Sequence, residues 1–129
     1  MTAGLSVARA TANLNIYRAT AQSAVSGFVK LHVGDPGVDG TANPSAVTTR
    51  NAITFDAPAE VSTTVAMELD ALAAYAMTAT ETISHVSIWD AASGGNFVES
   101  WALDSGVDVV NGSALAFTVF TLVYQPIAA

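Results

Sequence analysis

The sequence predicts a mainly β fold, an antiparallel β-sandwich of about six to eight strands with jelly-roll or immunoglobulin-like character, preceded by an N-terminal α-helix. From Gly27 onward, apolar and polar residues alternate in short runs, which is the period of a strand. Clusters rich in Gly, Pro, Asn, Asp and Ser separate these runs at the spacing of turns. We therefore expect one domain, with a helix in residues 1–26 and the sandwich in residues 27–129.

The helical period is confined to residues 3–25. Apolar and small side chains recur there at alternating spacings of three and four, as in one seam of a coiled coil. The seam consists of Val7, Ala10, Leu14, Tyr17, Ala21 and Ala24. Two packings fit this seam: the helix lies on the sheet of its own domain, or it lies against the same helix of other copies. Ser26 and Gly27 are expected to end the helix, with Gly27 as its C-terminal cap.

The strands are expected in the alternating runs. Their predicted ranges are 28–33, 52–55, 61–69, 83–89, 97–103 and 114–124, with a further short strand at 107–110. In the first strand, Val29, Leu31 and Val33 are expected to share one face. The alanine-rich segment 69–80 fits neither period clearly, and we expect a loop with room for a short helix there.

The composition restricts the classes of partner. The 129 residues are 51% hydrophobic and only 12% charged, so much of the surface is expected to be covered by copies of the chain or by other subunits. A soluble domain whose hydrophobic fraction is inflated by alanine is the alternative. The net charge of −7 and the four scattered cations disfavour a nucleic-acid partner and an anionic membrane surface. No apolar run approaches the roughly 20 residues of a membrane span.

The stretch LHVGDPGVDG, residues 31–40, most resembles a reactive site, but it fits no catalytic or metal pattern. His32 and His85 are the only bases around which a nucleophilic triad can form, both lie in predicted strands, and the chain has no cysteine. Asp35 and Asp39 are the best cation ligands, yet the further acidic ligands of a calcium loop are absent. We therefore expect no catalytic residue, no bound metal and no cofactor.

The same stretch has a simpler structural interpretation as a turn. In Asp35-Pro36-Gly37, the proline supplies a φ near −65° and the glycine a positive φ. The Asp side chain accepts hydrogen bonds from backbone N–H groups just downstream. The glycines are then present for the shape of the backbone.

A second stretch interrupted by turn-forming residues, SHVSIWDAASGGNFVESWAL at residues 84–103, predicts a β-hairpin with its turn at ASGG. Each of its two strands contains one tryptophan, Trp89 or Trp101. We interpret these two side chains as core residues. The alternative is a ligand platform, on which aromatic rings stack against the faces of sugars.

Three segments resemble one protein family when they are taken in order: LHVGDPGVDGTANPS (31–45), TTRNAITF (48–55) and ISHVSIWDAASGGNFVESWAL (83–103). They are similar to small virion proteins of tailed phages, labelled tail fibre, minor tail or structural proteins and common among phages of actinobacteria. The resemblance implies an N-terminal helix, a strand with an LH-x-G-D-P-G-x-x-G-T loop, an arginine-led strand and an HVSIWDA-x-x-GG hairpin. The final stretch FTVFTLVYQPIAA is more apolar than in such proteins, which indicates a buried edge or a neighbouring subunit.

The resemblance implies a non-enzymatic virion structural protein, tail-associated and of the minor tail or tail fibre type, assembled in the cytoplasm of the host bacterium. Its expected partners are copies of itself, in a homotrimer joined by the helix seam, and other virion proteins. A capsid decoration protein that stabilises the head is the first alternative. A receptor- or glycan-binding module that uses Trp89 and Trp101 is the second.

Overall fold

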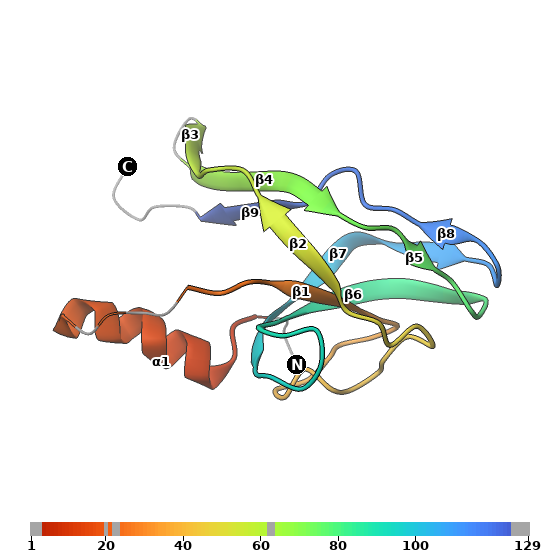
Figure 1. Ribbon diagram of the computed structural model, residues 1–129, viewed down its shortest axis with the longest axis horizontal. Helices are drawn as coiled ribbons and strands as arrows, with labels where there is room; N and C mark the ends of the chain where they lie inside the picture. The colour runs from red at the N-terminus through yellow and green to blue at the C-terminus, as the bar shows by residue number, and fades with distance from the viewer. Residues whose placement is uncertain (1–3, 20, 22–23, 62–63, 125–129) are drawn as a thin grey trace.

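The structure is a computed structural model that describes residues 4–19, 21, 24–61 and 64–124. It confirms a mainly β chain with one N-terminal helix (Figure 1). The helical elements are α1 (Val7–Asn15) and the 3-10 turn η1 (Ile16–Arg18). The strands are β1 (Phe28–His32), β2 (Asn51–Phe55), β3 (Ala59–Val61), β4 (Thr64–Leu72), β5 (Tyr75–Ala76), β6 (Glu81–Trp89), β7 (Phe97–Val109), β8 (Ala114–Leu115) and β9 (Thr121–Tyr124).

Seven strands form one antiparallel sheet, and β5 pairs with β8 in a small second sheet. The large sheet is bent into two layers, with β1, β6 and β7 in one and β3, β4 and β9 in the other (Figure 1). Strand β2 belongs to both layers. Asn51 and Ala52 pair with β1, whereas Ile53, Thr54 and Phe55 pair with β4. A strand that changes layers in this way forms the corner of a sandwich.

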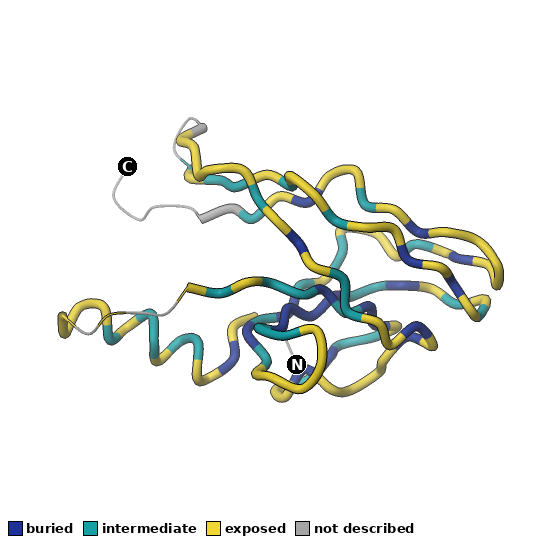
Figure 2. Tube along the Cα trace, viewed as in Figure 1, coloured by how far each residue is buried: buried dark blue, intermediate teal, exposed yellow. Residues whose placement is uncertain are grey.

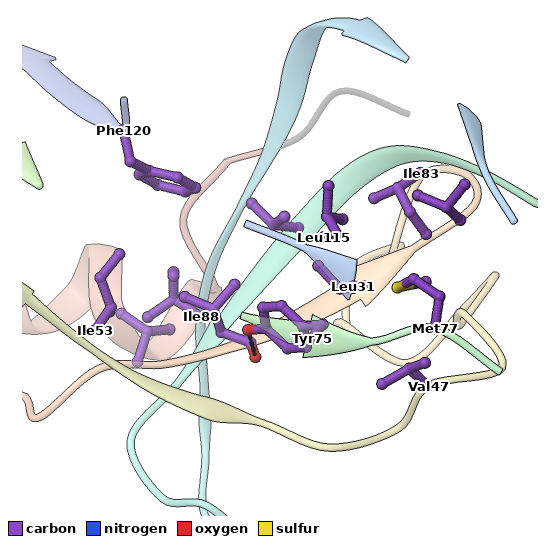
Figure 3. Close-up of a cluster of buried hydrophobic side chains, with 13 residues drawn as sticks. Leu31, Val47, Ile53, Tyr75, Met77, Ile83, Ile88, Leu115 and Phe120 are labelled. Atoms are coloured by element: carbon purple, nitrogen blue, oxygen red, sulfur yellow. Dashed lines mark hydrogen bonds between the residues drawn. The ribbon is translucent and has the colours of Figure 1, made fainter. Parts of the chain in front are cut away.

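Apolar side chains fill the space between the layers. Val29 and Leu31 of β1 are fully buried in this core. Tyr75 is 2% exposed, and its hydroxyl donates a hydrogen bond of 2.7 Å to the carbonyl oxygen of Val29. Figure 3 shows the Tyr75 ring between Ile88 and Met77. Because burial raises the pKa of Tyr75, its hydroxyl keeps its proton and remains a donor.

The N-terminal helix is shorter than the sequence predicts. The periodicity predicts a helix over residues 3–25, whereas α1 ends at Asn15 and η1 at Arg18. Ala19 then adopts the left-handed conformation, with a φ of 58°, well before the predicted cap at Gly27. None of the residues of α1 is buried, and a helix this short is not extended further when little tertiary packing supports it.

The predicted seam is therefore not one helical stripe. Ala21 and Ala24 follow the end of the helix and do not belong to it. The members that remain on α1 and η1 are Val7, Ala10, Leu14 and Tyr17. Residues 1–3, 20, 22 and 23, which the predicted helical region of residues 1–26 includes, lie outside the described residues.

Strand β1 ends one residue earlier than predicted. Val33 is 42% exposed and does not share the buried face of Val29 and Leu31. Its N–H donates to the carbonyl oxygen of Asn43 at 2.9 Å, so the chain here pairs with the following loop. The face of β1 opposite the core is also buried, through His32.

The alanine-rich segment 69–80 consists of strands and short connections, and the expected short helix is absent from it. Strand β4 runs into this segment as far as Leu72, and β5 follows. Tyr75 and Met77, two residues apart, are both 2% exposed, which is the spacing of a strand rather than a helix. The predicted strand at 114–124 is divided into β8 and β9, and the short strand predicted at 107–110 is the end of β7.

Candidate assembly interface

Two surfaces flank the layer of β1, β6 and β7. The loop unit consists of residues 33–50 and the β6–β7 turn at 90–96, and it covers the face of β1 and β6 opposite the core. The N-terminal segment consists of residues 4–18; it begins along β7 and continues as α1, which projects from one end of the molecule (Figure 1). The two surfaces use their polar and apolar groups in different ways.

His32 fastens the loop unit to the sheet. Its side chain is fully buried, with Nδ1 2.8 Å from the carbonyl oxygen of Ala42 and Nε2 2.7 Å from Ser87 Oγ. Because a carbonyl oxygen only accepts, Nδ1 donates and Nε2 accepts from the Ser87 hydroxyl. Trp89 Nε1 donates to the same hydroxyl oxygen at 2.9 Å. Burial lowers the pKa of His32, so the ring is held in its neutral form.

The turn after β1 forms as the sequence predicts. Asp35 Oδ1 accepts a hydrogen bond of 2.8 Å from Gly37 N, and Gly37 has a φ of 75°. Gly40 also has a positive φ, and a Cβ atom there would overlap the ring of Phe97, so this close approach requires glycine. Within the described residues, no three His, Asp or Glu side chains gather as a metal site. Asp35 and Asp39 stay the weak cation candidates of the sequence analysis, and the expectation that no metal binds there stays a prediction.

Arg50 closes the loop unit over the β6–β7 turn. Its Nη1 donates to the carbonyl oxygens of Gly94 at 2.6 Å and Ala91 at 3.1 Å. Its guanidinium carbon lies 3.9 Å from the centroid of the Trp89 ring, which is cation–π geometry. The loop unit therefore uses this charge to hold its own two halves together.

The β6–β7 turn is closed by a second polar contact. Asp90 accepts hydrogen bonds from the backbone N of Asn96 at 2.6 Å and from its Nδ2 at 3.0 Å. These bonds, together with the nearby charge of Arg50, lower the pKa of the Asp90 carboxyl. Both oxygens of this carboxylate are thus engaged within the turn.

The two tryptophans occupy separate aromatic clusters. Trp89 is 7% exposed and packs on Phe97, with ring centroids 5.7 Å apart. Trp101 packs on Phe120 at 4.8 Å. In the β6–β7 register, Trp89 is opposite Phe97 and Trp101 is opposite Val86. The interpretation of these two residues as core residues stays a prediction, and their use as a ligand platform stays its alternative.

Residues 4–6 form a strap along the edge of β7. Leu5 lies opposite Glu99 as an antiparallel pair. The backbone bonds on either side of this pair run from Ser6 N to Val98 O at 2.7 Å and from Ser100 N to Gly4 O at 2.8 Å. The strap covers only this short part of β7, which is the last strand of its layer.

Helix α1 starts at the strap and turns its small and polar side toward the body. Ser6 Oγ accepts a hydrogen bond of 3.1 Å from Arg9 N and caps the helix. A groove of about 450 Å³ separates α1 from the β6–β7 turn and the start of β7. Its helix wall consists of Ala8, Arg9, Ala12 and Asn15.

The large apolar side chains of α1 and η1 are exposed to solvent. Figure 2 shows exposed positions recurring along this segment. Val7 is 83% exposed, Leu14 68% and Tyr17 89%. In an ordinary surface helix the apolar side faces the core of its own domain. Here this orientation is reversed, because the side that faces the body holds the small and polar residues.

Glu99 lies partly buried where the strap meets β7. Burial raises the pKa of its carboxyl, although a hydrogen bond with Trp101 and the positive charge of Arg9 act in the opposite direction. The carboxyl is therefore easier to protonate in the folded protein than in water.

Charge is divided unevenly along the chain. Residues 1–34 contain Arg9, Arg18 and Lys30 and no acidic residue, a net charge of +3. Residues 35–129 contain one cation and all eleven acidic residues, a net charge of −10. The helical segment is thus a basic extension of an acidic body.

One family of known proteins matches almost the whole chain, including both surfaces. It is described as podophage GP4 fiber I protein gp80, and the match covers residues 4–125. The chain belongs to this family. The gp80-family chain is therefore a phage fibre protein and a component of the virion, in agreement with the tail-fibre-type resemblance. A comparison with curated proteins found no match.

The features that connect the elements of this gp80-family protein have weak signals in its sequence. Arg50 stands at the start of a strand, and nothing nearby indicates that it reaches across to the β6–β7 turn. The strap is too short to show a period. The absence of acidic residues before Asp35 is visible in the sequence and could have shown the division of charge. No helix in the described part of the chain is long and apolar enough to cross a membrane.

Proposed function

We propose that this fibre-family chain is a tail-associated, non-enzymatic subunit that assembles as a symmetric homotrimer and docks on other virion proteins. The observation that supports self-association is the reversed orientation of α1. The large apolar side chains of α1 and η1, above all Val7, Leu14 and Tyr17, are exposed to solvent in a single copy.

The energy available from covering this surface is large enough for assembly. Burying one side chain of this size contributes about 1.5–3 kcal/mol. Summed over the copies, three such side chains per chain reach the estimated cost of association, about 4–15 kcal/mol. The low charged fraction of 12% is consistent with a chain whose surface is covered in use.

Light scattering on the full chain tests this proposal. Leu14→Asp places a charge on the exposed apolar side of α1 and is expected to dissociate the oligomer. Val119→Asp is the matched control, because Val119 is 77% exposed but lies far along the chain from the N-terminal segment. The oligomer is expected to persist in this control. An oligomer of unchanged mass in Leu14→Asp, with the fold intact by circular dichroism, contradicts the proposal.

The position on the virion is tested separately. Gold-labelled antibody against the protein is expected to decorate the tail. Labelling of the head would replace the tail assignment with the capsid decoration alternative. Glycan recognition by Trp89 and Trp101 is tested on a glycan array, where loss of a signal in Trp101→Ala would support that alternative.

A further inference from the structure

We infer that the N-terminal segment is exchanged between copies, so that the strap of one chain pairs with β7 of a neighbour. This inference rests on the self-association proposed above and names the surface that accepts it. The partner is a second copy of this chain. Three features of the structure support it: the strap and its acceptor edge, the charge of the segment, and the end of the helix.

The strap and the β7 edge are complementary in their backbone hydrogen-bonding groups. The pairing of Leu5 with Glu99 uses two backbone bonds of 2.7 and 2.8 Å, and neither depends on which copy supplies the strap. The unpaired edge of a strand accepts a strand from another chain through the same bonds. Domain swapping of this kind needs no new contact chemistry.

The positive charge of the N-terminal segment favours its packing against the acidic residues 35–129 rather than against the same helix of another copy. α1 and η1 contain Arg9 and Arg18 and no acidic residue, so identical helices packed against each other bring like charges together. Residues 35–129, with a net charge of −10, attract this segment. Exchange also places each helix between two bodies, where its small side and its apolar side are both covered.

The end of the helix supplies a hinge. Ala19 has a φ of 58°, a left-handed conformation that is unfavourable for a residue with a Cβ atom. Strain of this kind persists only where the surroundings enforce it, and few contacts enforce it at the end of a helix without buried residues. Fully extended, the nine residues of the 19–27 connection reach at most about 30 Å.

Disulfide trapping separates exchange from pairing within one chain. The two backbone bonds flank the Leu5–Glu99 pair, which makes it a non-hydrogen-bonded antiparallel pair with Cα atoms about 4.5 Å apart. This spacing suits a disulfide. The natural chain has no cysteine, so the double variant Leu5→Cys/Glu99→Cys introduces the only two thiols.

After oxidation, the double variant is expected to run as covalent oligomers on a non-reducing gel, with the largest species giving the number of chains in the ring. The single variants Leu5→Cys and Glu99→Cys, unfolded and refolded together, are expected to give a disulfide-linked dimer. Mass spectrometry identifies the linked peptides from positions 5 and 99. Thr82→Cys/Asp108→Cys is the matched control, because this pair lies within one β6–β7 hairpin and links a chain only to itself.

The possible results separate this inference from the proposal on which it rests. An oligomer by light scattering whose double variant forms only intrachain disulfides overturns the exchange and leaves self-association standing. A protein that is monomeric at all concentrations overturns both. Ala19→Gly removes the energetic penalty of the left-handed conformation at position 19, which favours pairing of the strap within its own chain, and it leaves positions 5 and 99 unchanged. Introduced into the double variant, it is expected to lower the fraction of interchain disulfide several-fold.

Discussion

The loop unit and the N-terminal segment flank the same layer of strands. They differ in whether their side chains find packing and hydrogen-bond partners within the same chain. Arg50 and Asp90 of the loop unit, and His32 of β1 beneath it, have their hydrogen-bond partners inside the same chain. In the N-terminal segment, backbone bonds hold three residues of strap, while the helix exposes its apolar side. The difference indicates that the loop unit is complete in one copy and that the N-terminal segment is completed by another.

The largest expected effect is where the loop unit is fastened to β1 by His32. His32→Leu removes the donor to the Ala42 carbonyl and the acceptor of the Ser87 hydroxyl, and it leaves the buried Ser87 hydroxyl without that acceptor. We expect a loss of about 1–3 kcal/mol in the free energy of unfolding, which is the cost of one unsatisfied buried group. Urea denaturation followed by tryptophan fluorescence measures this loss.

The other histidine provides the control for that prediction. His85 is only partly buried, and its Nδ1 lies 2.9 Å from the hydroxyl oxygen of the adjacent Ser84. His85→Leu is expected to cost less than about 1 kcal/mol. Equal losses of unfolding free energy in the two variants would show that the hydrogen bonds of His32 do not hold the loop unit on the sheet. The contrast between the loop unit and the N-terminal segment would then fail.

A smaller effect is expected at Arg50, which holds the β6–β7 turn against the rest of the loop unit. Arg50→Lys keeps the charge but loses the planar group that stacks on Trp89 and bonds Ala91 and Gly94. We expect a loss of about 1–2 kcal/mol and faster amide hydrogen exchange at residues 91–96. Arg18→Lys, on the exposed helix end, is the matched change and is expected to leave stability within about 0.5 kcal/mol. A hairpin turn with unchanged protection would contradict this role of Arg50.

The smallest effect concerns Glu99 at the strap, and it depends on pH. Because the folded protein raises the pKa of this carboxyl, the folded state binds its proton more tightly than the unfolded state. The stability that Glu99 contributes is therefore fully present below the unfolded pKa, about 4.3, and is lost as the pH rises through the folded value. Glu99→Gln avoids this loss, so its melting temperature is expected to exceed that of the natural protein at pH 7.5 by a few degrees.

Calorimetry of both proteins at pH 4 and pH 7.5 measures the difference. The gain from Glu99→Gln is expected to shrink at pH 4, because protonation of Glu99 removes the charge that burial disfavours. Glu68→Gln, at an exposed position of β4, is the control for a general effect of net charge. A gain that is the same at both pH values would show that burial of the carboxyl is not its cause.

The fold and the loop unit are largely predictable from the sequence because their determinants are local. Alternation places the strands, and Asp35-Pro36-Gly37 specifies its turn through the preferences of three adjacent residues. The hairpin of β6 and β7 follows in the same way from its glycine-containing turn. In each case a short stretch contains its own signal.

The parts that are not predictable depend on contacts between distant residues. The period of three and four continues past Arg18, yet the helix ends there because few tertiary contacts stabilise it. The strands in the alanine-rich segment depend on the burial of Tyr75 and Met77 by the rest of the core. The exposed side of α1 carries the same residues that a buried side would, so the pattern does not show which way the helix faces.

The central position of β1 has a consequence for the order in which the chain is made. His32 and Ser87, which bond across β1 and β6, are 55 residues apart. At about 5–20 residues per second, a ribosome needs roughly 3–11 s to deliver the second partner after the first. During that interval the edge of β1 that later pairs with β6 has no neighbour. Crowded translation of many copies therefore exposes this strand to other nascent chains before its own hairpin arrives.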